Sequence, residues 1–236
     1  MVSLTKGFEK DSLLRMTEAS PYRLLLDADV LIKLSVLDCF SECIAALGFT
    51  LAECATMRSM TRSAGVDNQV VREQRAGGPG KPARRLFKTL SAIPTIDKMT
   101  DAEKLLSAAI SAAAQKHGLA FDGGEAMLAS VAIHRGLPFV TTGDKKAIAS
   151  LPVLAQHVAE VAQLRGKLLP LEYLLLKAIQ SLGLAALHAR IEAGKGCDAA
   201  VFHVVEEAGA DQLAFEAALV RKLRTVHAKA PGFLPA

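Results

Sequence analysis

Arg23-Leu24-Leu25-Leu26-Asp27-Ala28-Asp29-Val30-Leu31-Ile32 is the stretch that decides the fold, because an apolar run in it ends abruptly in carboxylates. Such a run is typical of a buried strand, and open α/β folds place their chemistry at the carboxyl ends of their strands. Two later segments, residues 121–126 and 137–144, repeat the pattern of apolar structure ending in acid. Three separated acidic clusters predict one metal site.

Strand-like and helix-like patterns alternate along the first 150 residues. Thr100 and Glu103 have the spacing of a capping box, which predicts a helix starting at Asp101. The expected strands cover residues 24–27, 49–52, 92–96 and 138–141. The expected helices cover residues 30–47, 54–65, 101–118 and 122–136. This alternation favours an α/β fold with a central parallel sheet, in a three-layer α/β/α arrangement.

Beyond residue 150 the pattern becomes helical. The expected helices cover residues 153–164, 170–182, 184–193 and 198–227, with one short strand at 167–169. The sequence therefore predicts an α/β domain at residues 1–155 and a C-terminal helical extension at residues 156–236. The domain carries a basic, glycine-rich insertion at about residues 58–90, with its clearest loop at residues 76–82.

The composition and the spacing of apolar residues and cysteines predict the environment of the protein. Hydrophobic residues make up 51% of the 236, yet no uninterrupted apolar stretch reaches the roughly 18 residues that span a bilayer. We therefore expect no membrane partner, and the absence of a signal-peptide apolar core near the N-terminus predicts a cytoplasmic location. The four cysteines contain no C-x-x-C pair and form no compact disulfide framework, so they are expected to be reduced.

Basic residues are concentrated between the second and third expected strands, where Asp67 and Glu73 are the opposing charges. Lysine and arginine contacts to a phosphate backbone release condensed counterions, so a phosphate backbone is a natural partner for such a segment. A solvated helical face is the alternative interpretation. The candidate RNA-binding residues are Arg58, Arg62, Arg72, Arg75, Lys81, Arg84, Arg85 and Lys88.

Residues 22–150 resemble the PIN domain family of metal-dependent ribonucleases. The resemblance is carried by Asp27-Ala28-Asp29-Val30 after the first strand, by Asp122-Gly123-Gly124-Glu125-Ala126, and by Thr141-Thr142-Gly143-Asp144-Lys145. It implies that Asp27 is the first acid and Asp144 the last. Glu53, expected just after the second strand, stands at the position of the second acid, and Glu42 competes for that role.

The resemblance implies catalysis by Asp27, Glu53, Asp122 and Asp144, with Mg²⁺ or Mn²⁺ held by Asp27, Asp122, Glu125 and Asp144. Hard divalent cations prefer carboxylate oxygens and keep several waters, which suits an open cluster of acids facing a phosphodiester. Asp122 and Glu125, three residues apart, project from the same face of a helix start. Asp29, Thr141 and Thr142 are expected to support the site.

The implied activity is endoribonucleolytic hydrolysis of RNA, as in the toxin of a toxin–antitoxin pair. RNA is the expected partner, and an antitoxin protein and a homo-oligomer are further candidates. Two alternatives stay open. The motif around Asp27 also resembles the haloacid-dehalogenase-type phosphohydrolases, in which Asp27 is a covalent nucleophile and Asp29 its general acid/base. The third interpretation is a non-catalytic PIN-like scaffold that binds RNA or a protein.

Overall fold

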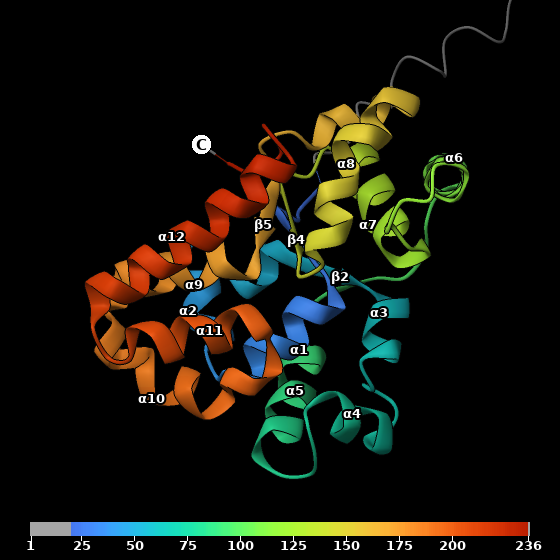
Figure 1. The fold of residues 1–236 in the computed structure, drawn as a ribbon. Helices are drawn as coiled ribbons and strands as arrows, with labels where there is room; N and C mark the ends of the chain where they lie inside the picture. Colours follow the sequence, from blue (N-terminus) through green and yellow to red (C-terminus); the bar gives the residue numbers. More distant parts are fainter. Residues whose placement is uncertain (1–19, 236) are drawn as a thin grey trace, which may run out of the picture.

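The computed structural model describes residues 20–235, which form a five-stranded, all-parallel sheet (Figure 1). The strand order is β3-β2-β1-β4-β5, so β1 is central. Leu24 of β1 pairs with Cys54 of β2 on one side and with Phe139 of β4 on the other. The predicted α/β class with a parallel sheet is confirmed. The strands are β1 (Leu24–Leu26), β2 (Cys54–Met57), β3 (Thr95–Ile96), β4 (Phe139–Thr142) and β5 (Leu168–Pro170).

Helices cover both faces of the sheet, consistent with the expected three-layer arrangement. Successive strand residues point to opposite faces, so Leu24 and Leu26 join one hydrophobic cluster and Leu25 joins the other. The first cluster includes α1 (Ala28–Val36), α2 (Phe40–Ala46), α5 (Lys81–Ala92) and α9 (Leu171–Leu182). The second includes α6 (Asp101–Lys116), α7 (Gly123–His134) and α8 (Lys145–His157), which lie together in Figure 1.

The helix predicted at residues 30–47 is two helices, α1 and α2. Asp38 between them has a φ of 56°, in the left-handed region that interrupts a helix and that aspartate tolerates better than most side chains. Two arginines hold this turn: Arg190 donates to the Asp38 carbonyl at 2.7 Å, and Arg85 donates to the Asp38 carboxylate at 2.8 Å. Apolar spacing continued through the break and concealed it.

The second strand was predicted too early in the chain. Residues 51–53 form a 3₁₀ turn, η1 (Leu51–Glu53), and β2 follows it. The physical reason is a capping box, in which the carboxylate of Glu53 accepts from the backbone N–H of Thr50 at 2.8 Å. Glu53 therefore precedes β2 instead of following it.

The basic insertion is mostly helical. It contains α3 (Arg58–Ser63), α4 (Gln69–Arg75) and the start of α5, which begins with Pro82 in its first turn. The predicted helix 54–65 is thus confined to α3, and the irregular part of the glycine-rich loop ends at Gly80. The apolar face of α5 packs into the first cluster through Ala83, Leu86 and Leu90.

The segment predicted as a helical extension takes part in the sheet. Its short strand, predicted at 167–169, is β5, and the predicted helices 170–182 and 184–193 are α9 and α10 (Leu184–Gly194). The predicted helix 153–164 belongs to α8, which begins at Lys145, and to the 3₁₀ helix η2 (Ala159–Leu164). After a further turn, η3 (Lys195–Cys197), the predicted helix 198–227 divides at Gly209, φ 53°, into α11 (Ala199–Ala208) and α12 (Gln212–Lys229).

The C-terminal segment also covers the outer edge of the sheet. Phe215 of α12 joins the first cluster and Val226 the second, so this helix reaches from one to the other. Leu168 of β5 donates its backbone N–H to the carbonyl of Phe233 at 3.1 Å.

The first 19 residues of the predicted domain 1–155 lie outside the described part of the chain. No helix within residues 20–235 combines the length and the apolarity of a bilayer-crossing segment.

Arg85 connects α5 to the end of α1. Its guanidinium donates to the carbonyls of Ser35 at 3.1 Å and Val36 at 3.0 Å, which satisfies acceptors that the helix end leaves open. Charged hydrogen bonds are each worth about 1.5 to 3 kcal/mol. Arg85→Ala should therefore lower the free energy of unfolding by about 2 kcal/mol or more in urea denaturation.

Arg84→Ala is the matched control. Arg84 is exposed, and within the described residues its side chain makes no hydrogen bond or ion pair. Its replacement should change the unfolding free energy by less than about 0.5 kcal/mol. Equal effects of the two substitutions would contradict the structural role of Arg85.

Candidate active site

An open cleft of about 710 Å³ lies where the carboxyl ends of β1 and β4 meet the first turns of α1, α7 and α8. The sequence placed acids at these three points, and the structure brings them together. The charged residues that line the cleft are Asp27, Asp29, Asp122, Glu125, Asp144, Lys33, Arg75, Lys145 and Lys146.

Asp27 occupies the N-cap position of α1 without capping it. Its backbone N–H donates to the hydroxyl of Thr141 at 3.0 Å, and its carboxylate accepts from the backbone of Gly143. Burial raises the pKa of Asp27 to about 6, and the neighbouring charge of Asp29 adds to this shift. The Asp27 carboxylate also lines the cleft.

Asp122 and Glu125 lie at the start of α7, where a helix was predicted, and the structure adds that they form a capping box. Asp122 Oδ1 accepts from the backbone N–H groups of Gly124 at 2.7 Å and Glu125 at 3.0 Å. Burial opposes the shift, yet these N–H donors hold the pKa of Asp122 below its usual value. Burial raises the pKa of Glu125 to about 8, and the charges of Asp122 and Asp144 contribute. Glu125 and Asp144 both line the cleft.

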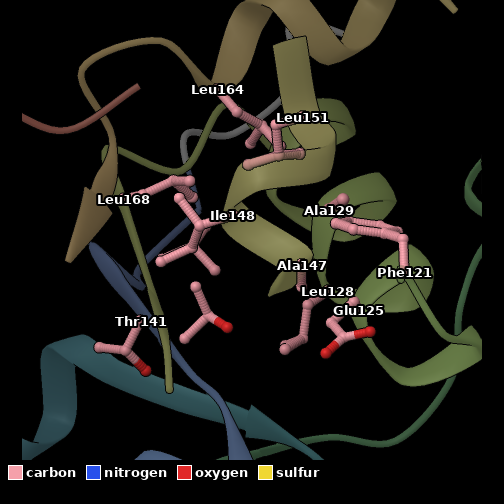
Figure 2. A pocket seen from close by; sticks show the side chains of 12 residues that line it. Phe121, Glu125, Leu128, Ala129, Thr141, Ala147, Ile148, Leu151, Leu164 and Leu168 are labelled. Atoms are coloured by element: carbon pink, nitrogen blue, oxygen red, sulfur yellow. The ribbon is translucent and has the colours of Figure 1, made fainter. Parts of the chain in front are cut away.

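The burial of Glu125 has a visible source. It lines a small apolar pocket together with Leu128, Ala147 and Ile148, between α7, α8 and β4 (Figure 2). A volume of about 20 Å³ leaves room for about one water molecule. A substrate must therefore lie in the larger cleft, with Glu125 at the boundary between the two.

Asp144 caps α8, with Oδ1 accepting from the backbone of Lys146 at 2.6 Å and Ala147 at 3.1 Å. The hydroxyl of Thr142 accepts from the backbone N–H of Asp144 at 3.3 Å. Thr141 and Thr142 are both buried, and their hydroxyls bind the backbone at Asp27 and Asp144. These two threonines therefore orient the acids of the cleft.

Asp29 is held by a neighbouring cation. Lys33 lies 2.6 Å from Asp29 Oδ2 and 2.9 Å from Asp198, the N-cap residue of α11. Burial opposes the shift, but hydrogen bonds and charge from these two aspartates raise the pKa of Lys33 well above its usual value. A Cβ atom at Gly143 would lie 2.0 Å from Asp29 Oδ2, so only glycine fits beside this ion pair.

The structure does not bring the expected second acid to the cleft. Glu53 lies at the amino end of β2, the opposite edge of the parallel sheet, and pairs with Arg23 at 3.2 Å. Its competitor Glu42, which lies on α2, pairs with Arg190 at 2.5 Å. The carboxyl end of β2 carries Arg58, and α3 contains no acid. The prediction placed the second strand before Glu53, whereas in the structure β2 follows Glu53. Glu53 therefore lies at the edge of the sheet opposite the cleft.

Of the eight basic residues predicted to bind RNA, Arg75 lines the cleft. Arg72 and Arg85 have structural contacts: Arg72 donates to the carbonyl of Gly65 at 2.7 Å, and Arg85 holds the end of α1. The other predicted RNA-binding residues are exposed, and two of them, Arg58 and Arg62, pair with surface aspartates. The other residues are Arg58, Arg62, Lys81, Arg84 and Lys88.

No role was predicted for three lysines that line the cleft, Lys33, Lys145 and Lys146, or for two acids that pair with the first two of them, Asp198 and Glu172. Asp198 and Glu172 come from the predicted extension, more than 25 residues after the last acidic motif. Asp198 carried a helix-start signal, because it precedes an apolar helical pattern. Nothing in the sequence indicated that either acid would reach a lysine of the cleft.

The donor set fits a hard divalent cation. Its members are carboxylates, and a bound cation would relieve the charge repulsion that, together with burial, raises the pKa of Asp27 and Glu125. Within residues 20–235, no three His, Cys, Asp or Glu side chains are close enough to form a ready metal site. Mg²⁺ keeps several waters and binds through one or two carboxylates, so it does not require a closed cage.

Comparison of the chain with protein-family models, with curated proteins and with solved structures finds no match.

The raised pKa values of Asp27 and Glu125 predict how stability depends on pH without metal. Both groups hold their protons more tightly in the folded than in the unfolded state. The free energy of unfolding should therefore fall as pH rises from about 4, and the loss should level off only above about pH 9, since Glu125 is still half protonated at its folded pKa of about 8. Urea denaturation in EDTA at several pH values measures this slope.

Glu125→Gln should flatten that slope and stabilise the protein at pH 8.5 by roughly 1 to 2 kcal/mol, since one unit of pKa corresponds to about 1.4 kcal/mol and Glu125 is half-buried. Glu53→Gln, at the opposite edge of the sheet, should leave the slope between pH 5 and 8.5 unchanged. A variant at position 125 with the wild-type slope would show that Glu125 is not the titrating group.

Proposed function

We propose that this protein is a PIN-like endoribonuclease that uses Mg²⁺ or Mn²⁺ to hydrolyse RNA phosphodiester bonds. One observation carries the proposal: the carboxylates of Asp27, Glu125 and Asp144, from three distant segments, line one open cleft at the carboxyl edge of a parallel sheet. Open α/β folds bind their ligands at this edge.

The metal would take its one or two carboxylate ligands from Asp27, Glu125 and Asp144. When bound, Mg²⁺ or Mn²⁺ supplies Lewis-acid activation of water and of the phosphodiester. Asp122 fixes the first turn of α7 and thereby the carboxylate of Glu125, through the capping box. Thr141 and Thr142 fix the backbone at Asp27 and Asp144 in the same way. The chain thus supplies three acids whose positions are set by hydrogen bonds.

RNA is supported as the substrate by the cations around these acids. Arg75, Lys145 and Lys146 line the cleft, and exposed Lys81, Arg84 and Lys88 follow on the neighbouring helix. Phosphate groups are the ligands that such a surface attracts. With two tyrosines and no tryptophan, the chain has few aromatic platforms for stacking single-stranded bases. We infer that recognition depends on the charge and shape of the backbone.

The phosphohydrolase alternative receives less support from the cleft. It requires Asp29 as a mobile proton donor and acceptor, but Asp29 is paired with Lys33 at 2.6 Å and packed against Gly143. It also gives Asp122 and Glu125 no task. Cleavage of a phosphomonoester in place of RNA would favour this alternative.

The decisive experiment is cleavage of labelled structured and total RNA with Mg²⁺, Mn²⁺ or EDTA. Asp27→Asn, Glu125→Gln and Asp144→Asn should each reduce cleavage by about a hundredfold or more, equal to about 2.7 kcal/mol of transition-state stabilisation. Asparagine at position 144 retains a side-chain oxygen for the cap of α8, so the fold should persist. Circular dichroism checks this directly.

Glu53→Gln is the matched control, because Glu53 is a carboxylate of the same sheet at the opposite edge. It should cleave like the wild type. Loss of activity in this control, or full activity in the Glu125→Gln variant, would overturn the assignment of the site. Folded protein that cuts no RNA with either metal would favour the scaffold interpretation.

A further inference from the structure

Glu172 is a buried acid without an assigned role. It stands in the first turn of α9, directly after β5, and its side chain is 1% exposed. Among the described residues, Oε2 of this carboxylate has no hydrogen-bond partner. Within that part of the chain, the one cation at ion-pair distance is Lys145, whose Nζ lies 2.5 Å from Glu172 Oε1.

Stability alone does not account for this pair. A buried carboxylate loses its hydration, and an ion pair in such a place is often no more stable than two apolar side chains of the same volume. Buried polar atoms without hydrogen bonds are rare in proteins. An acid retained there under these conditions points to a task performed through its partner.

Lys145 connects this buried acid to the cleft. It follows Asp144 directly, it lines the cleft, and its side chain is 36% exposed. An ammonium group has three donors, so one can face Glu172 while others face the cleft. The ammonium of Lys145 is therefore held by Glu172 on the buried side and accessible from the cleft on the other side.

The neighbouring lysines lack this combination. Lys33 is paired with two aspartates and is 15% exposed, so its ammonium is already satisfied. Lys146 is exposed, and no carboxylate of the described residues lies within ion-pair distance of it. Lys145 alone among these three is held by one acid and open to solvent.

We propose that Glu172 is a positioning residue that holds the ammonium of Lys145 at the wall of the cleft, where Lys145 binds a phosphate of the RNA backbone beside Asp144. This inference rests on the proposed function. A lysine that is already ordered loses less side-chain entropy when a phosphate binds. The C-terminal segment thereby takes part in substrate binding through α9.

Electrostatics and positioning predict opposite results for Glu172→Gln. Removing a negative charge close to the cleft should tighten RNA binding if charge alone matters. If Glu172 positions Lys145, the same substitution should weaken binding, because Lys145 loses its anchor. The sign of the change therefore separates the two effects.

The test measures fluorescence anisotropy of a labelled RNA oligonucleotide with the full chain, with Ca²⁺ in place of Mg²⁺ or Mn²⁺. Glu172→Gln and Lys145→Met should each weaken binding by about three- to tenfold. The double variant should bind no more weakly than Lys145→Met, because Glu172 then has nothing to position. Lys146→Met is the control, and its effect should add to that of Glu172→Gln.

A cleavage assay supplies the second measurement. Glu172→Gln should raise KM and leave kcat unchanged, since Lys145 contacts a phosphate in the bound and transition states alike. General damage to the fold would lower kcat as well. The double variant also removes the unpaired buried charge that Lys145→Met alone would create, so it remains a folded comparison if the single variant is unstable.

Unchanged or tighter binding by Glu172→Gln, or additive effects of the two substitutions, would overturn the inference and leave the proposed nuclease intact. RNA binding that responds as expected without any cleavage by Mg²⁺ or Mn²⁺ would support the positioning role and refute the nuclease. A wild-type chain that binds no RNA would overturn both.

Discussion

The parallel pairing of β1 with β2 and β4 is the constraint on which the rest of the molecule depends. Leu24, Leu25 and Leu26 are fully buried, and neighbouring strands lie on both sides of them. Because the strands run in one direction, the residues that follow them gather at one edge. That edge receives Asp27 from β1 and Asp144 from β4, and α7 adds Glu125. Helix starts and the acids of the cleft consequently meet in the same few residues.

The cleft shows how capping and ligand binding share a carboxylate. Asp122 and Asp144 each direct one oxygen to the backbone of the helix that follows, which fixes the side chain at the mouth of the cleft. Asp27 has the same position relative to α1 but makes no such bond. Capping thus orders two acids, while burial and mutual repulsion raise the proton affinity of Asp27 and Glu125. The site is preorganised by the same hydrogen bonds that start its helices.

The sequence was sufficient for features determined by local residues. The capping box at Thr100, the helix start at Asp122, the strand before Asp27 and the acid after β4 all appear where the patterns predicted them. It failed at Asp38, where two distant arginines stabilise a turn inside an apolar pattern, and at Glu53, where a local capping box delays β2. The ion pairs of Glu172 and Asp198 could not be predicted from the sequence, because their partners lie 27 or more residues away in the chain. Local chemistry determines helix starts, whereas long-range ion pairs appear only after folding.

The backbone contact between Phe233 and β5 has a practical consequence. β5 is an outer strand of the sheet; the carbonyl of Phe233 accepts from the N–H of its first residue, Leu168, and the carbonyl of Gly232 accepts from Gly166, just before the strand. An outer strand without such a cover offers a template to any other extended chain. A shortened form that ends before residue 232 would therefore leave the outer edge of β5 uncovered. We expect such a form to aggregate in solution by edge-to-edge pairing of this strand.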